Sequence, residues 1–247
     1  MSNFNIEILY EDDNVLAINK PAGLVVHPDG RTKEESVSEW LLGKYPDAEG
    51  VGESIKSPEG EEIKRSGVVH RIDRETSGVL LLAKTELGFE NLKLQFQNRE
   101  IHKTYLAFVH GIVKDDHGVI TLPIGKSPSD FRRWSAGRGS RGFKREAVTY
   151  FKVLKRSDNA TLIEAKPKTG RTHQIRVHFT ALQRPLVGDK LYAASKPSLY
   201  GFDRLALHSR EIEFKDCSDV VHQVKASCPK DFLNAFKEIG YMPLDLP

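Results

Sequence analysis

The sequence predicts an α+β fold with a mixed, largely antiparallel sheet and flanking helices. Short apolar or alternating runs, typical of strands, outnumber the segments with helical spacing. The two kinds of segment do not alternate strictly along the chain, which argues against a doubly wound parallel sheet. The 247 residues, 39% of them hydrophobic and 29% charged, suit a globular protein with an ample core. We therefore expect one domain over residues 1–247.

A hairpin and a helix are predicted first. The runs 6–10 and 15–19 are separated by polar residues typical of a turn. Lys20-Pro21-Ala22-Gly23 ends the second strand, since proline and glycine interrupt regular structure. The segment 36–45 carries apolar residues on one side of a helix. The polar stretch 46–64, rich in glycine and proline, is predicted to be a mobile loop.

The rest of the chain supplies further strands and helices. Continuous or alternating apolar residues predict strands over 79–83, 104–109, 148–154, 161–165, 211–214 and 220–225. Helical spacing predicts helices over 86–98, 172–182 and 230–239. In the segment 172–182, Ile175, Phe179 and Leu182 form the apolar stripe, and Thr172 is the predicted N-cap.

The net charge of +3 hides an uneven distribution of charged residues. The segment 131–145 has no acid and holds Arg132, Arg133, Arg138, Arg141, Lys144 and Arg145. The segment 165–190 has Asp189 as its one acid and holds Lys166, Lys168, Arg171, Arg176, Arg184 and Lys190. We expect these segments to form a basic face that suits a polyanion such as nucleic acid. Two solvated loops are the alternative.

Several classes of protein are excluded by what the sequence lacks. It contains no run of about 18 apolar residues, which excludes a membrane helix. Its N-terminus lacks the basic start and apolar stretch of a secretion signal, so we expect a cytoplasmic protein. Cys217 and Cys228 are too far apart for a C-x-x-C pair, and reduced cysteines are favoured over a disulfide. His173 and His178 lack metal-binding spacing, so no metal is expected.

The stretch His70-Arg71-Ile72-Asp73-Arg74-Glu75-Thr76-Ser77-Gly78 is the most informative in the chain. Its carboxylate, Asp73, has basic neighbours at 70, 71 and 74, and nearby cations keep a carboxylate ionised. Such a carboxylate can act as a nucleophile or stabilise positive charge at a sugar carbon. The alternative is a turn in which Asp73 only pairs with an arginine.

A second polar stretch runs from Lys168 to His178. Gly170 would let the backbone approach a ligand closely. His173 and Gln174 would fall in the first turn of a helix, where backbone amides face outward. Arg176 could reach a carboxylate elsewhere in the chain. The alternative is a basic amphipathic helix that packs on the sheet.

Together with three other segments in the same order, these stretches resemble the RluA-type family of pseudouridine synthases. The similar segments are Asn19-Lys20-Pro21-Ala22-Gly23 with His27, His70 to Gly78 with Ile72 where leucine is usual, Lys103-Thr104-Tyr105, Gly170 to Arg176, and Gly188-Asp189-Lys190-Leu191-Tyr192 followed by Leu205-Ala206-Leu207-His208. The resemblance covers about 8–236. It implies the pseudouridine synthase fold, a stand-alone catalytic domain without an S4 domain, and no cofactor.

The resemblance implies an isomerase that acts on structured RNA, either rRNA or tRNA, as a monomer. Such an enzyme detaches uracil from C1′ of a uridine, turns it and reattaches it through C5. Asp73 matches the catalytic aspartate, Arg176 would pair with it, and Tyr105 would stack on the base and assist the C5 proton transfer. A covalent sugar adduct and an elimination at C2′ both remain open.

The target base must leave its stack, and Arg71 or His70 is the predicted wedge in the gap. Phe131, Trp134 and Phe143 lie among the bases of segment 131–145 and suit stacking on RNA. The predicted RNA contacts are His70, Arg71, Arg74, Lys103, Arg132, Arg133, Arg138, Arg171, His173 and Gln174.

Two other functions remain as alternatives. An RNA-binding protein of the same fold that has lost catalysis is disfavoured by the intact Asp73, Tyr105 and Arg176. A phosphotransferase with an aspartyl nucleophile is suggested faintly by Asp73 to Thr76, but the second aspartate of such a motif is missing.

Overall fold

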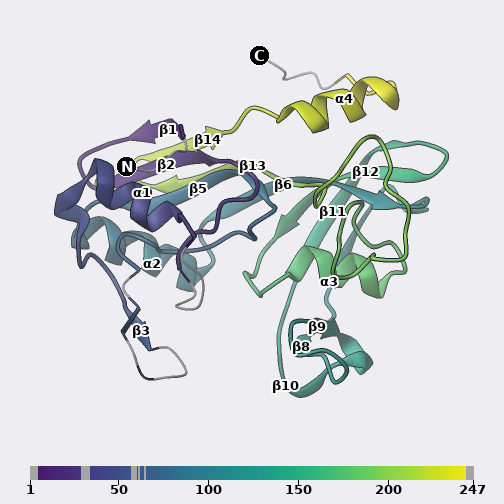
Figure 1. The fold of residues 1–247 in the computed structure, drawn as a ribbon, viewed down its shortest axis with the longest axis horizontal. Coiled ribbons are helices and arrows are strands. Elements are labelled where there is room, and N and C mark those ends of the chain that lie inside the picture. Colours follow the sequence, from purple (N-terminus) through teal and green to yellow (C-terminus); the bar gives the residue numbers. More distant parts are fainter. Residues whose placement is uncertain (1–4, 29–33, 57–59, 61, 64, 243–247) are drawn as a thin grey trace. The chain divides into compact units, whose positions relative to one another are not determined.

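The structure is a computed structural model that describes residues 5–28, 34–56, 60, 62–63 and 65–242 (Figure 1). The chain forms two compact units. The first consists of residues 1–102 and 211–226, and the second of residues 103–210 and 227–247. Strand β13 (Leu207–Lys215) contributes residues to both. The expectation of a single domain stays a prediction.

The first unit is built on an antiparallel sheet and two helices. Its strands are β1 (Glu7–Glu11), β2 (Val15–Lys20), β5 (Ser77–Ala83), the end of β13, and β14 (Val221–Lys225). The pairs β1–β2, β2–β5 and β13–β14 are all antiparallel. Helix α2 (Glu86–Asn98) buries Leu92 against Ala17 and Leu81 of the sheet. These strands and α2 confirm the predicted elements.

Helix α1 (Val37–Lys44) begins where the sequence predicts a helix because its start is capped. The Glu39 amide donates to the Ser36 hydroxyl (3.3 Å), and the Ser36 amide donates to the Glu39 carboxylate (2.9 Å). This reciprocal pair satisfies two amides that have no partner inside the helix.

The stretch 46–64 differs in part from the predicted loop. It holds a short 3-10 helix, η1 (Pro46–Ala48), and a two-residue strand pair, β3 (Ile55–Lys56) with β4 (Glu62–Ile63). Residues 57–59, 61 and 64 lie outside the described residues.

The second unit has a four-stranded antiparallel sheet with a helix on each face. The strand order is β6 (His102–His110), β12 (Ala160–Pro167), β11 (Thr149–Arg156), β7 (His117–Ile120). Helix α3 (Gln174–Ala181) covers one face through Phe179, whose ring centroid lies 5.6 Å from that of Phe151. Helix α4 (Lys230–Glu238) covers the other face (Figure 1). There Phe232 packs on Phe108.

The register of this sheet decides which face carries Tyr105. Phe151 lies opposite Ala165, and Ala165 lies opposite Tyr105. Directly opposed residues point to the same side of a sheet. Tyr105 therefore shares the face that α3 covers.

A separate three-stranded sheet was not predicted from the sequence. It consists of β8 (Ile124–Lys126), β9 (Trp134–Ala136) and β10 (Arg141–Arg145), in the order β10-β8-β9, and we call it the basic sheet. Ile124 anchors it in a small core with Ala147 and Val177 of α3. Every residue of β10 is exposed, so its strand lacks the apolar alternation on which sequence-based assignment depends.

The predicted N-cap of α3 is wrong by one residue. His173, not Thr172, is the N-cap residue, and it has a left-handed backbone (φ 55°, ψ 23°) and no side-chain cap hydrogen bond.

None of the helices in the described part of the chain has the length and hydrophobicity that a membrane span requires.

The buried His178 makes stability depend on pH. Its Nε2 donates to the Leu122 carbonyl (2.9 Å), and its Nδ1 accepts from the Thr149 hydroxyl (2.9 Å). Burial lowers the pKa of His178, so the folded protein resists the proton that the unfolded chain accepts below about pH 6.5. We expect the contribution of neutral His178 to the free energy of unfolding to be complete above that pH and to be lost as the pH falls.

Urea unfolding of wild type and His178→Gln between pH 7.5 and 5 should show a smaller loss of unfolding free energy in the variant. The exposed His117→Gln is the control, and equal slopes for all three proteins would contradict the prediction.

Candidate functional site

Asp73 lies half-buried on a turn that leads into β5. Ile72, next to it, is buried, and the Thr76 amide donates to the Asp73 carbonyl (3.0 Å) to close the turn. Gly78, opposite Lys20 in the sheet, has φ +106°, which a residue with a side chain rarely adopts. The backbone around Asp73 is thus fixed on both sides by buried or constrained residues.

A fully buried lysine holds this turn from the neighbouring segment. The Lys20 ammonium is 0% exposed and donates to the carbonyls of Pro21 (2.8 Å), Leu24 (2.7 Å) and Arg74 (2.9 Å). The Gly23 amide also donates to the Arg74 carbonyl (2.9 Å). The sequence predicted no role for Lys20 beyond its place in a motif and at the end of a strand, and its position next to the apolar run Val15–Ile18 was the available signal.

The basic residues beside Asp73 take different roles in the structure. Arg71 is exposed and donates to His27 Nε2 (3.3 Å), while His27 Nδ1 donates to the Pro28 carbonyl (2.9 Å). Arg74 pairs with Glu34. These contacts leave Arg71 and Arg74 with side chains that reach the surface of the first unit.

His70 is held more tightly than a wedge residue needs to be. Its Nε2 accepts from the Leu81 amide (2.9 Å), and its ring packs on that of Phe96 with the centroids 4.6 Å apart. The sequence left Arg71 and His70 as alternative wedges, and this difference favours Arg71.

In the second unit the Lys103 and Gly170 segments come together. A Cβ built on Gly170 would lie 3.8 Å from the Lys103 ammonium nitrogen. Burial lowers the pKa of Lys103 to about 8. Tyr105, two residues along β6, is 8% exposed. Two of the similar segments, far apart in sequence, thus meet on the face of the sheet that carries Tyr105.

Arg176 makes a two-pronged ion pair with Asp189. Its Nε donates to Oδ2 (2.7 Å) and its Nη2 to Oδ1 (2.9 Å), and the Asp189 side chain has no exposed surface. Sequence analysis named Asp73 as the partner of Arg176 and gave Asp189 no role. Asp73 belongs to the first unit and Arg176 to the second, so their pairing stays a prediction.

Gln174 has an internal role. Its side chain is 5% exposed, donates to the Val148 carbonyl and the Thr149 hydroxyl (both 2.9 Å), and accepts from Thr169 (2.7 Å) and the Arg171 amide (3.0 Å). These four bonds fill its hydrogen-bonding capacity. Its predicted contact with RNA has no support from this placement. Arg171 is partly exposed, and its Nε donates to the Glu146 carbonyl (3.0 Å).

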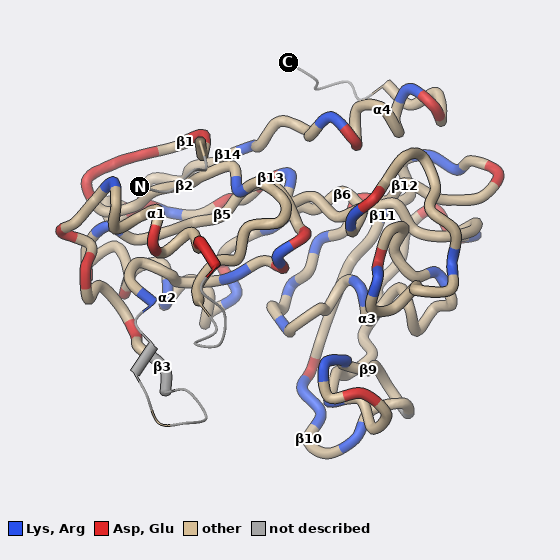
Figure 2. The backbone as a smooth tube through the Cα atoms, in the orientation of Figure 1, with Lys and Arg blue, Asp and Glu red and all other residues tan. Residues whose placement is uncertain are grey.

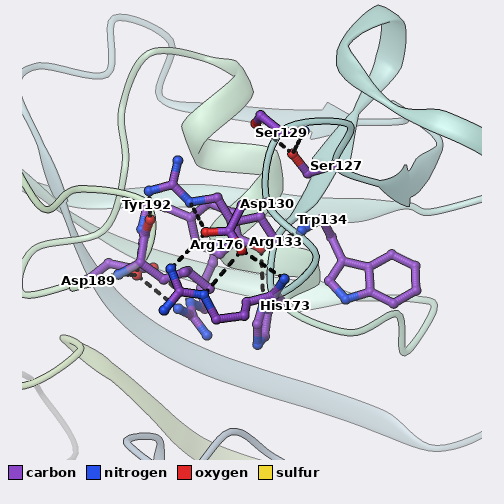
Figure 3. A network of polar contacts seen from close by, with 11 residues as sticks. Ser127, Ser129, Asp130, Arg133, Trp134, His173, Arg176, Asp189 and Tyr192 are labelled. Carbon is purple, nitrogen blue, oxygen red and sulfur yellow. Dashed lines mark hydrogen bonds and ion pairs between the residues drawn. The ribbon is translucent and has the colours of Figure 1, made fainter.

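Tyr192 joins α3 to the basic sheet (Figure 3). Its hydroxyl lies 2.9 Å from His173 Nδ1 and accepts from the Trp134 amide at 2.9 Å. The Arg176 guanidinium carbon lies 5.0 Å from the centre of the Tyr192 ring. Arg133 donates to the Leu191 carbonyl next to it. His173 and Arg133, both predicted to contact RNA, thus meet at one side chain.

The basic sheet is less uniformly positive than the sequence window suggests. Asp130, one residue before the window, accepts from Arg132 Nε (3.1 Å) and Nη2 (2.9 Å), which lowers the pKa of Asp130 to about 2. The exposed bases of β10, which Figure 2 shows in blue, are Arg141, Lys144 and Arg145. Phe143, in β10, is 85% exposed, and Phe131, in the loop between β8 and β9, is 81% exposed. The side chain of Arg138 lies outside the described residues.

Residues 14–181 match the family model described as RNA pseudouridylate synthase. The chain is 38% identical over 210 residues to an uncharacterized RNA pseudouridine synthase of Synechocystis, covering 85% of this chain and 61% of that protein. It is 37% identical over 220 residues to ribosomal large subunit pseudouridine synthase D of Xanthomonas campestris, again covering 85% and 61%. It thus spans about three fifths of the length of these relatives. The solved human RNA pseudouridylate synthase domain containing 4 is similar in fold, with TM-score 0.73, 25% identity, and 96% and 94% of the two chains covered.

Replacing Lys20 should loosen the Asp73 turn. In Lys20→Met three carbonyls, at least partly buried, lose a charged donor, so we expect the free energy of unfolding to fall by about 2–4 kcal/mol. Lys225→Met removes a partly exposed lysine paired with Glu211 and should cost less than about 1 kcal/mol. Urea unfolding of both variants measures the difference. Similar losses would show that Lys20 has no special structural role.

Proposed function

Because the chain belongs to the RNA pseudouridylate synthase family, we propose that it isomerises uridine to pseudouridine within RNA. The reaction breaks the bond between N1 of uracil and C1′ of the ribose and forms a bond from C5 to C1′. C5 loses its proton, and N1, freed from the sugar, takes one up. Atoms and charge balance within the nucleoside, so the chemistry needs only a carboxylate and proton transfer.

The placement of Asp73 is the observation that carries this proposal. The residue stands half-buried on a constrained turn with Arg71 and Arg74 on either side of it in the chain. Loss of uracil gives the sugar positive charge, and an anionic oxygen held near the anomeric carbon stabilises that charge. A carboxylate on a fixed backbone does so without reorganising when the bond breaks.

Arg176 and Tyr105 supply the remaining roles. We assign to Arg176 the pairing with Asp73 that keeps its carboxylate ionised and aimed. Asp189 engages the Nε and Nη2 edge of the guanidinium and so fixes its orientation within the second unit. Tyr105, on the α3 face, is assigned to stack on the uracil ring.

Ribosomal RNA is the substrate class that we favour. The Xanthomonas relative carries the name of a ribosomal large subunit enzyme, while transfer RNA has no such support. We assign the RNA backbone to Arg141, Lys144 and Arg145, with Phe131 and Phe143 stacking on unpaired bases. Arg71, exposed at the surface of the first unit, is the proposed wedge.

Asp73→Asn should abolish isomerisation and leave RNA affinity within about threefold, because the charge is used in the transition state. The rate is measured as tritium released from C5-labelled uridine in a ribosomal RNA transcript, and affinity by filter binding. Glu75→Gln, which removes a carboxylate from the same turn, is the matched control and should retain most of the rate. Turnover by Asp73→Asn equal to that of the control would refute the assignment. Binding without tritium release by the wild type would favour a non-catalytic RNA-binding protein.

Neutralising the bases of β10 should weaken the dependence of RNA affinity on salt. Changing Arg141, Lys144 and Arg145 to glutamine removes up to three phosphate contacts, so the slope of log affinity against log salt should drop by about 2–3. Arg132→Gln should change it little, because Asp130 already pairs with Arg132. Filter binding between low and moderate salt measures both slopes. An unchanged slope in the triple variant would place the RNA track elsewhere.

A further inference from the structure

Asp189 has no exposed side-chain surface, and four hydrogen bonds reach its carboxylate. Two come from the Arg176 guanidinium, and the backbone amides of Leu191 and Tyr192 donate to Oδ1 at 3.0 Å each. A buried charge is tolerated only when partners surround it in this way. The same carboxylate therefore fixes both the guanidinium of Arg176 and the chain at 191–192.

Tyr192 contacts both the Arg176 guanidinium and the basic sheet. Its ring lies beside the Arg176 guanidinium, with 5.0 Å between the guanidinium carbon and the ring centre. Its hydroxyl oxygen accepts from the Trp134 amide and lies 2.9 Å from His173 Nδ1. Because Trp134 belongs to β9, a single side chain touches both the arginine and the backbone of the basic sheet.

Other contacts tie the basic sheet to the same two residues. Arg133 donates to the Leu191 carbonyl, and its guanidinium carbon lies 5.9 Å from the Tyr192 ring centre. Trp134, in turn, lies under the Lys126 ammonium, 4.3 Å from the nitrogen to the ring centre. A displacement of β9 would therefore first displace residues 191–192, whose backbone amides bind the Asp189 carboxylate.

We propose that Asp189 and Tyr192 are positioning residues that couple Arg176 to the basic sheet, so that RNA bound on the sheet sets the guanidinium in place. The inference rests on the proposed function, in which Arg176 acts at Asp73 and the basic sheet contacts RNA. Neither Asp189 nor Tyr192 touches the reacting nucleoside in this scheme. Both act through Arg176.

A second ion pair, Arg204 with Asp231, resembles the Arg176–Asp189 pair but does not connect to the basic sheet. Arg204 donates to Asp231 through Nε (2.6 Å) and Nη2 (3.0 Å), and its guanidinium carbon lies 5.8 Å from the Phe232 ring centre. This fork has the geometry of the Arg176–Asp189 fork and an aromatic neighbour, but it joins α4 to the 204–207 segment. It reports what such a fork contributes to stability alone.

The first test separates positioning from binding. In Tyr192→Phe the ring stays beside Arg176 while the hydroxyl link to Trp134 and His173 is lost. We expect the single-turnover rate at saturating ribosomal RNA transcript to fall about tenfold, with the dissociation constant within about twofold. Tyr200→Phe, which removes a hydroxyl bonded to Ser157 in the same unit, is the control and should keep the wild-type rate.

The second test compares the two forks. Asp189→Asn should lower the single-turnover rate by about 100-fold or more, whereas Asp231→Asn should lower stability without changing the rate. Asp189→Glu keeps the charge and should recover part of the rate. Should Asp189→Asn fail to fold, Asp189→Glu and Tyr192→Phe still decide the question.

A double-mutant cycle tests the coupling itself. The triple change of Arg141, Lys144 and Arg145 to glutamine should lower the saturated rate in the wild type but not in Tyr192→Phe, where the link is already cut. Additive effects, or unchanged rates in Tyr192→Phe and Asp189→Glu, would overturn the proposal.

Amide hydrogen exchange tests the coupling without a measurement of catalysis. The same RNA transcript should slow amide exchange at Trp134, Leu191 and Tyr192 in the wild type, and at Trp134 alone in Tyr192→Phe. Protection of β10 without any protection at 191–192 would also overturn it. A wild type that releases no tritium but shows the coupled protection would refute the proposed reaction while the coupling stands.

Discussion

A lysine ammonium buried without solvent contact holds the turn on which the proposed chemistry depends. A charge in that position is unfavourable unless donors and acceptors match, and three backbone carbonyls meet Lys20. The carbonyls come from two segments that are 54 residues apart at Lys20 and Arg74. These hydrogen bonds add to the burial of Ile72, so that Asp73 remains half-exposed on a backbone that is held in place.

The second unit also contains a buried charge held by hydrogen bonds, but here the buried group is negative and its partner is positive. There a carboxylate is buried and the cationic partner, Arg176, is 10% exposed. Low dielectric strengthens each of its hydrogen bonds and makes the loss of any partner costly. The two units thus each contain a buried charge that orients a neighbouring charge nearer the surface. In the proposed reaction, each unit would hold its own charged group in place before substrate binds.

The sequence predicted most of the regular structure because apolar spacing decides it. Helix α2 runs from Glu86 to Asn98 as predicted, and the main strands of both units overlap the predicted runs, except β7 (His117–Ile120), which was not predicted. The strands of the basic sheet were missed because they are short and their exposed residues follow no alternation. The residues around Asp73 were found from their motif, whereas the roles of Lys20, Asp189 and Gln174 depend on partners distant in the sequence. Composition also misled in one place, since Asp130 stands just outside the basic window and neutralises Arg132.

Strand β10 has a further property that follows from its place in the sheet order. It is a terminal strand of the basic sheet, bonded to β8 on one side, and terminal strands are open to pairing with a second chain. Its sequence, Arg-Gly-Phe-Lys-Arg, combines a solvent-facing phenylalanine with three positive charges. Like charges that face one another across such a pairing repel. This repulsion disfavours pairing of two copies of the chain along β10 and so opposes aggregation.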